Sequence, residues 1–356
     1  MAQKITHWLL ISLVLTLGFG QLLRFEAWGI PLYLHDLLVV LILILNLRGL
    51  SSKVRKVSLG LKLLFLGLGL GWLQALTLYP LVLLLTPFLY TLRLLAYIAL
   101  YLILKAHNYK LKASYLLFSG FISVLIGTLQ YFLMPDMRLF QYLGWDDHLN
   151  RVILPHFDPT FSSVMFVIFG LLAYETKHYW LALVSLPAVF LSYARSTWLS
   201  TLVTLTTRLP RYLVIGLSLA VIVVAVLLPR GQYGEGTNLL RTYSISSRVS
   251  YDLSLLSSVG WRSIIGVGYN TLSLRITPVK EFVNHATGTN NSYLEIFLTT
   301  GILGLLGSLL ILRDFSRTFP YKSILTFILI ASFFNNVLLY PFVMLWLVML
   351  SLSYNR

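Results

Sequence analysis

Residues 289 to 307 read TNNSYLEIFLTTGILGLLG, an apolar stretch that opens with a cluster of polar side chains. The apolar part is typical of a membrane span, and stretches long enough to cross a hydrocarbon core of about 30 Å recur along the whole chain. Of the 356 residues, 58% are hydrophobic and 11% are charged. The sequence therefore predicts a polytopic membrane protein in which one span begins with two asparagines and a serine.

The apolar stretches are expected to be α-helices, because a helix satisfies every backbone N–H and C=O group within its own segment. We predict about twelve spans, at residues 5–22, 31–47, 59–78, 81–104, 113–133, 159–174, 178–193, 196–207, 212–228, 291–312, 323–339 and 342–354. Since the span at 196–207 is too short to cross alone, residues 180 to 207 alternatively form one long, broken or tilted element. The expected fold class is an all-α, polytopic helical membrane protein with a single integral membrane domain over residues 1–356.

Lys and Arg residues indicate the orientation, because an excess of them in short loops marks the cytoplasmic side. With the N-terminus inside, the inner loops carry Lys53, Arg55, Lys56, Lys62, Lys105, Lys110, Lys112, Arg208, Arg211, Arg313, Arg317 and Lys322, and the short outer loops are nearly bare. No small-residue cleavage site follows the first span, so we expect this span to be retained. Both termini are therefore predicted to be cytoplasmic.

Two longer connections fall on the predicted extracytoplasmic side, at residues 134–158 and 229–290. A connection of about sixty residues is long enough to form a lid or a binding element. Within it Ile245, Val249, Leu253 and Leu256 recur at helical spacing, which predicts an amphipathic helix on the membrane surface. The chain has no Cys, so packing must shape this loop.

The net charge of +15 is explained largely by the inner loops. Basic residues nevertheless remain on the outer side, where the same rule predicts few: Arg195, Arg230, Arg241, Arg248, Arg262 and Arg275. This placement disfavours nucleic acid as a partner. It favours an anionic, lipid-linked substrate.

Asn290 and Asn291, followed by nine residues and Gly301-Ile302-Leu303-Gly304, resemble a motif of the O-antigen ligase and O-antigen polymerase superfamily, except that the family has His where Asn290 stands. Further stretches resemble family motifs in the family's order: GWDDHLNRVILPHFDPTF (144–161), SYARSTWLS (192–200), SRVSYDL (247–253) and SIIGVGYNTL (263–272). The resemblance covers roughly residues 134 to 307.

The resemblance implies a metal-independent glycosyltransferase of the bacterial inner membrane that uses a polyprenyl-diphosphate-linked glycan and no cofactor. Asn290 and the GWDDH loop favour an O-antigen polymerase, which transfers the glycan to a lipid-linked acceptor; a chain-length regulator is a further candidate partner. The alternative is an O-antigen ligase, which transfers the glycan to a lipid A core during lipopolysaccharide biosynthesis. A lipid-linked glycan transporter, from a different class, should show internal repeats and polar residues on both sides, whereas the polar clusters here lie on one side.

Arg195 and Arg248 are the first candidates to stabilise a departing diphosphate, because a guanidinium makes two charge-assisted hydrogen bonds to phosphate and stays protonated. The simpler interpretations are an interfacial anchor for Arg195 and a solvated helix face for Arg248. Further candidates for substrate binding are Arg93, Arg151, Arg241, Asp146, Asp158, Asn291 and Tyr293. The polar start of the span at 291 is then expected to face a water-filled sugar site.

A base must also remove the proton of the attacking sugar hydroxyl, and the family's His is suited to this. Asn290 cannot accept the proton. Three alternatives follow: His285 acts from five residues earlier; Asp146, Asp147 or Asp158 acts; or Asn290 only orients the hydroxyl.

Two patterns invite other interpretations. Asp146, Asp147 and His148, with His156 and Asp158, have the side chains of a metal site, but an acidic loop is the simpler reading and we predict no metal. Gly266-Val267-Gly268 is interpreted as a turn, since a third Gly and a βαβ pattern are absent.

Arg93 lies near the middle of its span, where a charge needs a partner. Asp36 is the predicted partner; in the functional alternative, Arg93 forms the base of an outward cavity.

Overall fold

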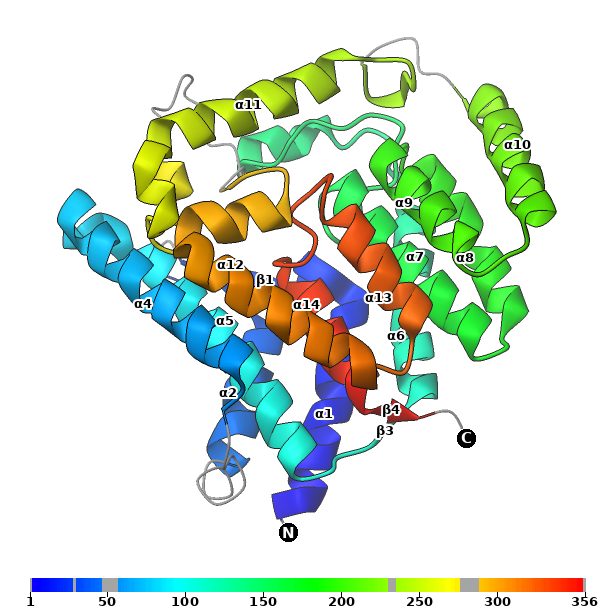
Figure 1. Ribbon diagram of the computed structural model, residues 1–356. Helices are drawn as coiled ribbons and strands as arrows, with labels where there is room; N and C mark the ends of the chain where they lie inside the picture. The colour runs from blue at the N-terminus through cyan, green and yellow to red at the C-terminus, as the bar shows by residue number, and fades with distance from the viewer. Residues whose placement is uncertain (1, 28–29, 47–56, 230–234, 276–287, 355–356) are drawn as a thin grey trace.

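The computed structural model describes residues 2–27, 30–46, 57–229, 235–275 and 288–354, and it is mostly helical (Figure 1). A helix lies in each of the twelve predicted ranges: α1 (Ala2–Phe19), α2 (Leu34–Asn46), α4 (Leu59–Leu78), α5 (Leu81–Ala106), α6 (Ala113–Leu133), α7 (Pro159–Glu175), α8 (Tyr179–Leu191), α9 (Arg195–Thr206), α10 (Arg211–Leu227), α12 (Ser292–Thr318), α13 (Lys322–Ala331) and α14 (Pro341–Leu352). Residues 192 to 194 separate α8 from α9, so these are two helices.

The remaining elements are short, apart from α11 (Tyr243–Val259) in the large loop. They are the 3-10 helices η1 (Gly20–Leu23), η3 (Arg138–Leu143), η4 (Glu235–Thr237), η5 (Gly260–Ile264) and η6 (Leu272–Arg275). Strands β1 (Arg24–Ala27) and β2 (Ile30–Tyr33) form an antiparallel hairpin, and β3 (Leu111–Lys112) pairs in parallel with β4 (Ser353–Tyr354).

Among the described residues, five helices are long and apolar enough to cross a membrane: Gln3–Leu23, Leu59–Leu78, Leu81–Ala106, Ala113–Leu133 and Ser292–Thr318. The shorter apolar helices have 10–17 residues. This architecture is compatible with an all-α membrane protein, whereas a count of twelve spans is not confirmed. A helix of 17 residues reaches only about 26 Å, so a shorter helix must tilt little or be completed by its neighbours to cross.

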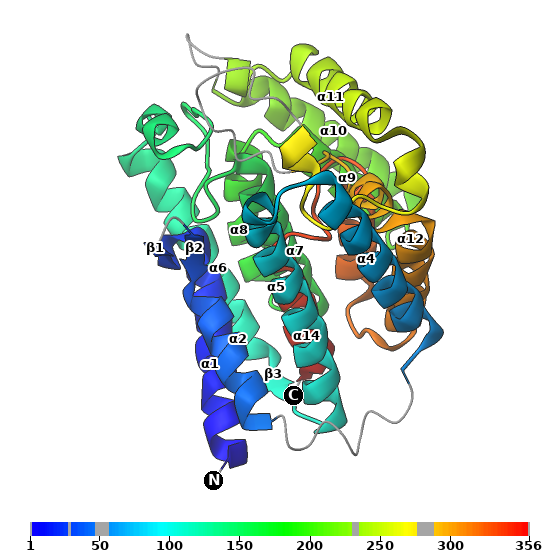
Figure 2. The same cartoon turned by 90° about the vertical axis from the view of Figure 1, so that its left-hand side faces the viewer.

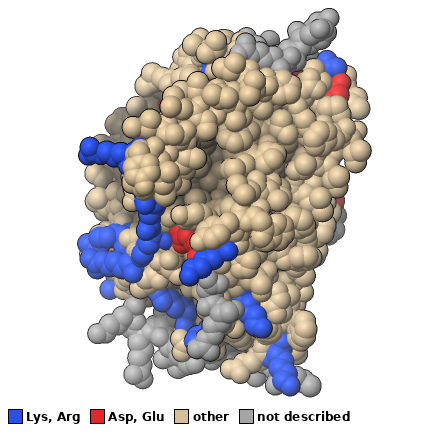
Figure 3. All heavy atoms as spheres, turned by 90° about the vertical axis from the view of Figure 1, so that its right-hand side faces the viewer, with Lys and Arg blue, Asp and Glu red and all other residues tan. Residues whose placement is uncertain are grey.

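Both chain ends lie toward the end of the molecule opposite α11, which crosses the top of the bundle (Figures 1 and 2). On the face drawn in Figure 3, Lys and Arg side chains gather in the lower part, below a broad surface that is nearly free of charge. The hydrophobic core joins α1, α6, α7, α13 and α14, where Phe166, Phe327 and Trp346 are at most 1% exposed. This core packs together helices that border polar residues, such as Asp158 before α7 and Asn335 after α13.

Helices α4 and α12 approach closely along a row of small residues (Figure 2). A Cβ at Gly67 would lie 2.5 Å from the carbonyl oxygen of Thr300 and from the amide nitrogen of Gly304. Small residues permit such contact between backbones in helical membrane proteins, where helices are held together largely by van der Waals packing. The closely spaced glycines of α4 and α12 therefore favour the pairing of these two helices.

Helix α12 is interrupted at Gly301, whose φ of 70° and ψ of −172° are not helical. Glycine adopts this conformation without a steric cost. The break leaves carbonyl groups free, and the amides of Val267 and Gly268 donate to the carbonyl oxygens of Leu298 and Thr299, each at 3.0 Å. The Gly266-Val267-Gly268 segment, predicted as a turn, is irregular backbone between the turn residues 265 and 269–270. The amides of Val267 and Gly268 satisfy backbone groups that the interruption of α12 would leave unpaired.

The helix predicted over 323–339 ends earlier, at Ala331, and residues 332–340 form an irregular connection. The polar start of α12 pairs with this connection. The Ser292 amide donates to the Ser332 carbonyl at 2.9 Å, and the Ser292 hydroxyl donates to the Asn335 carbonyl at 3.2 Å. The Asn291 side-chain amide donates to the Phe333 carbonyl at 3.2 Å. Asn291 and Ser292 therefore satisfy backbone carbonyl groups of this irregular connection, which explains why the helix begins with polar residues.

The amphipathic helix predicted in the large loop is present as α11. Its Leu255 and Val259 are buried against the protein, at 2% and 1% exposure. The predicted apolar stripe of Ile245, Val249, Leu253 and Leu256 faces away from the protein and is exposed. An outward apolar stripe on a helix across the end of the bundle is the arrangement expected of a helix at a membrane surface.

Candidate functional site

A polar cavity of about 540 Å³ lies beneath α11 and is enclosed by segments far apart in the sequence. The β1–β2 hairpin, α5, the 144–161 region, α11, the start of α12 and residues 335–344 all contribute to its wall. The charged and amide side chains that line it are Arg24, Arg93, Arg248, Asp146, Asp158, Glu295, Gln21, Asn270, Asn290, Asn335 and Asn336. A cavity of this size suits a small ligand or a part of a larger one.

Arg248 reaches the cavity from α11 and is held by an amide. Its Nη1 donates to Oδ1 of Asn335 at 2.8 Å, and the Asn335 Nδ2 donates in turn to the Ser196 hydroxyl at 3.2 Å. Arg24 enters from β1, with its Cζ 5.4 Å from the Trp145 ring. An arginine has five N–H donors, so both guanidinium groups retain donors for a ligand.

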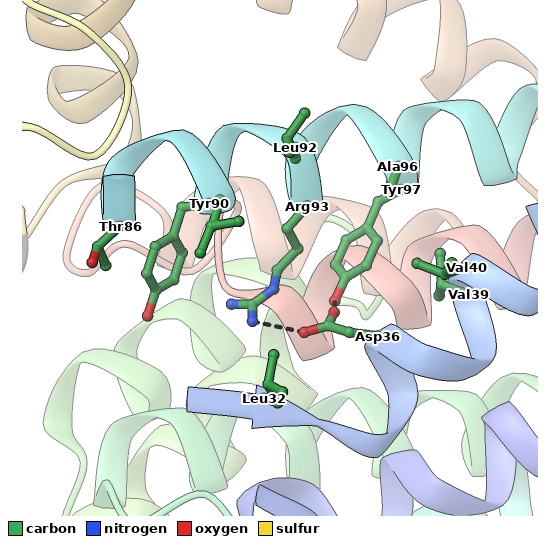
Figure 4. Close-up of a pocket in the computed structure, with 11 residues that line it drawn as sticks. Leu32, Asp36, Val39, Val40, Thr86, Tyr90, Leu92, Arg93, Ala96 and Tyr97 are labelled. Atoms are coloured by element: carbon green, nitrogen blue, oxygen red, sulfur yellow. Dashed lines mark hydrogen bonds and ion pairs between the residues drawn. The ribbon is translucent and has the colours of Figure 1, made fainter. Parts of the chain in front are cut away.

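Arg93 forms the predicted ion pair: its Nη2 lies 2.6 Å from Oδ2 of Asp36, and Tyr97 donates its hydroxyl to Oδ1 of Asp36 at 2.5 Å. Figure 4 shows Arg93 extending from α5 toward Asp36, between Tyr90 and Tyr97. Because Asp36 is in the first turn of α2, Arg93 lies at the level where α2 begins rather than midway through the bundle. Arg93 also lines the polar cavity, so its ion pair with Asp36 is compatible with the cavity interpretation, which stays a prediction.

Among the described residues, three carboxylates line the cavity, and two of them have structural partners. Asp158 caps α7, because its Oδ1 accepts from the amides of Thr160 and Phe161 at 2.7 and 2.8 Å. Oε2 of Glu295, which is 3% exposed, accepts from the Thr289 amide at 2.6 Å. Both residues therefore hold the backbone that shapes the cavity.

Asp146 is the carboxylate at the exposed side of the cavity. Surrounding protein displaces part of the water around its carboxyl group, and this desolvation raises the pKa of Asp146 above its ordinary value. The negative charges of Asp158 and Asp147 raise this pKa further, while the positive charge of Arg248 lowers it. A raised pKa makes the carboxylate a stronger proton acceptor.

Three of the predicted arginines bind backbone carbonyl groups of connecting segments rather than line the cavity. Arg195 donates from Nη1 to the carbonyl oxygens of Leu239 and Arg241 at 2.8 and 2.6 Å, and from Nη2 to the Ser244 hydroxyl at 2.9 Å. Arg241 donates to the Gly236 carbonyl. Arg151, 6% exposed, donates from Nε to the carbonyl oxygen of Ser192 at 3.0 Å.

The predicted asparagine pair separates into two roles. Asn290 lines the cavity, and its amide N–H donates to Oδ1 of Asp252 on α11 at 2.9 Å, which joins α11 to the start of α12. The Oδ1 of Asn291 caps α12 by accepting from the Tyr293 and Leu294 amides at 2.9 and 3.1 Å.

The other residues of the predicted site are distributed as follows. The Tyr293 hydroxyl donates to the Leu329 carbonyl at 2.9 Å, so this side chain also has a structural partner. His285 and Arg230, like the inner-loop residues Lys53, Arg55 and Lys56, lie outside the described residues. In the part of the chain that the structure describes, no three His, Cys, Asp or Glu side chains are grouped to hold a metal ion.

Two of the polar residues that matter most for this geometry, Arg24 and Asn335, are not among the residues predicted from the sequence. Arg24 was detectable, since it is a basic residue between the first two spans, on the outer side where few are expected. Asn335 gave no such signal, because it lies inside a stretch interpreted as a continuous span.

No protein-family model and no curated protein matches the chain.

Proposed function

We propose that the protein is an integral membrane glycosyltransferase that polymerises polyprenyl-diphosphate-linked oligosaccharide units on the extracytoplasmic side. The observation that carries this proposal is the polar cavity, in which Arg24, Arg93 and Arg248 converge with Asp146 beneath α11. Cations suit a diphosphate, and the amides and carboxylates suit sugar hydroxyls. The resemblance of the 134–307 region to the O-antigen polymerases supports the same chemistry.

In the proposed reaction, an acceptor sugar hydroxyl attacks the anomeric carbon of the donor. The new glycosidic bond forms as the bond from that carbon to the diphosphate oxygen breaks, and polyprenyl diphosphate leaves with the bonding electrons. Negative charge collects on the leaving group, and fixed guanidinium donors stabilise it in the transition state. Arg248 from α11 and Arg24 from β1 fill this role.

The proton of the acceptor hydroxyl goes to Asp146 in this proposal. Asp146 lines the cavity together with Arg248, and its raised pKa suits a general base. Asp158 and Glu295 are less suited, because each carboxylate already holds backbone groups in place: Asp158 caps α7, and Glu295 accepts from the Thr289 amide.

The function is tested with purified protein, a polyprenyl-diphosphate oligosaccharide and a chelator of divalent cations. We expect a ladder of lengthened lipid-linked products, formed equally with and without the chelator, because guanidinium groups supply the positive charge. A single glycan added to a lipid A core, without a ladder, would support the ligase alternative. Complete loss in chelator, restored by Mn²⁺ or Mg²⁺, would contradict the metal-independent mechanism, and no transfer to either acceptor would reject the function.

The proposal also requires the cavity to face away from the cytoplasm, with the twelve predicted spans in the membrane. Because the chain has no Cys, single cysteines report on orientation. We expect Ser250→Cys, exposed on α11, to react with a membrane-impermeant thiol reagent added to intact cells. Thr318 is exposed at the C-terminal end of α12, and the other end of this helix is joined to α11. Thr318→Cys should therefore react only after lysis. The reverse pattern would place the cavity in the cytoplasm.

A further inference from the structure

A second cavity, of about 270 Å³, lies between α2 and α5. We call it the α2–α5 groove; its apolar wall consists of Leu32, Val39, Val40, Leu89, Leu92 and Ala96. Val40 and Leu92 are 47% and 43% exposed, so the groove has an outward-facing apolar side. On the surface of a membrane protein, such a groove faces hydrocarbon chains rather than water.

The α2–α5 groove and the polar cavity share a wall made by Tyr90, Arg93 and Tyr97. Arg93 is the charged member of this wall, and its Cζ lies 5.0 Å from the Tyr33 ring centre and 4.8 Å from that of Tyr90. Two aromatic rings and Asp36 therefore fix the guanidinium between an apolar compartment and a polar one. A molecule with a hydrocarbon chain and an anionic group matches this sequence of environments.

The depth of Arg93 fits a lipid phosphate. Arg93 is about 18 Å along α5 from Leu81. However, its partner Asp36 directly follows the β1–β2 hairpin, which carries Arg24 and the exposed Glu26. Charged residues of this kind mark the water-facing end of a span. Arg93 consequently lies close to the boundary between water and lipid, where phosphate groups of lipids are found.

We propose that the α2–α5 groove binds the hydrocarbon chain of the lipid-linked donor next to its diphosphate, and that Arg93 binds the diphosphate where the groove meets the polar cavity. This inference rests on the proposed function and names the subsite for the lipid part of the donor. Asp36 keeps Arg93 compensated when no lipid is bound, because an unpaired charge buried in protein is costly. Nη2 of Arg93 pairs with Asp36, and a guanidinium has five N–H donors, so others serve the phosphate.

Binding is tested first by photo-crosslinking, without reference to activity. The probe is a polyprenyl phosphate with a diazirine on the isoprene unit nearest the phosphate, added to the protein in lipid nanodiscs. We expect crosslinks to peptides of α2 and α5 that unlabelled polyprenyl diphosphate removes and that phosphatidylglycerol at the same concentration does not. Equal removal by phosphatidylglycerol would mean that the groove holds bulk lipid, and crosslinks elsewhere would also overturn the proposal.

A bulky side chain in the groove tests the chain-binding part. Leu92→Trp should raise the KM for a long-chain donor by about tenfold, because excluding two methylene groups from an apolar site weakens binding by about that factor. The KM for a donor with a short prenyl chain should change less than twofold. Leu83→Trp is the matched control, since Leu83 is 50% exposed on α5 and outside the groove. An equal effect of both variants, or none from Leu92→Trp, would contradict the proposal.

A charge-free variant tests the phosphate-binding part. Arg93→Gln alone leaves Asp36 without its cation, so both charges are removed together in Asp36→Asn/Arg93→Gln. We expect this variant to lose at least tenfold in crosslinking by the polyprenyl phosphate probe and to retain crosslinking by the corresponding polyprenol. Crosslinking in α2 and α5 without glycan transfer by the wild type would reject the proposed function only. Transfer without these crosslinks would reject the groove only.

Discussion

Replacing Arg248 by Gln is expected to lower the rate of glycosyl transfer by about a hundredfold to a thousandfold, the usual cost of losing one preorganised donor to a developing anion. Arg248 lines the cavity from α11 and is oriented by Asn335. Arg248→Lys should recover only part of the rate, because Lys keeps the charge but lacks the planar fork that binds two phosphate oxygens. Turnover is measured per molecule of protein that elutes as a monodisperse species.

Arg138 provides the matched control for this substitution. It lies in the 134–158 connection, its side chain is 54% exposed, and it pairs with Asp136 at 2.7 Å away from the cavity lining. Arg138→Gln should therefore retain turnover, because an exposed ion pair contributes little.

The result that would contradict the role of Arg248 concerns Arg195, whose guanidinium binds loop carbonyls. If Arg195→Gln reduces turnover a hundredfold at an unchanged melting temperature while Arg248→Gln does not, the diphosphate binds at Arg195.

Replacing Asp146 by Asn should lower the rate by about a hundredfold to ten-thousandfold, the contribution of a general base. The pH profile provides a second measurement. Only the deprotonated carboxylate accepts a proton, so the wild-type rate rises with pH through the pKa of Asp146 and then levels off. Because desolvation and the nearby Asp158 and Asp147 raise this pKa, the acid limb should lie at higher pH than for an ordinary aspartate. Asp146→Asn should lack this limb.

Asp147→Asn distinguishes a base from a residue that only shapes the loop. Asp147 raises the pKa of Asp146 through its negative charge, so removing that charge should move the acid limb to lower pH and leave most of the plateau rate. An unchanged limb position would show that another group titrates. Retention of the wild-type rate by Asp146→Asn would exclude Asp146 as the base and return that role to His285 among the candidates.

The sequence by itself determined where the helices lie, because their positions depend on local properties. A continuous apolar stretch must satisfy its own backbone groups in lipid, and this requirement holds for α4 or α6 regardless of their neighbours. The amphipathic spacing of Ile245, Val249 and Leu253 likewise predicted α11. The Asp36–Arg93 pair was predictable for a related reason, since a charge within an apolar helix needs an opposite charge close by.

Only the tertiary structure decided which polar residues meet in the cavity. Asn335 belongs to a stretch that reads as a span, and it becomes the partner of Arg248 because α13 ends at Ala331. Arg195 and Arg248 look alike in sequence, yet one binds loop carbonyls and the other lines the cavity.

The same distinction applies to the polar start of α12, which was predicted to face a sugar site. Asn290 does line the cavity, but Asn291 and Ser292 satisfy the backbone of residues 332–340. The physical reason is that a polar side chain binds whichever unpaired group lies nearest in the folded chain. A segment about forty residues away supplies that group, so the sequence around Asn291 and Ser292 does not reveal it.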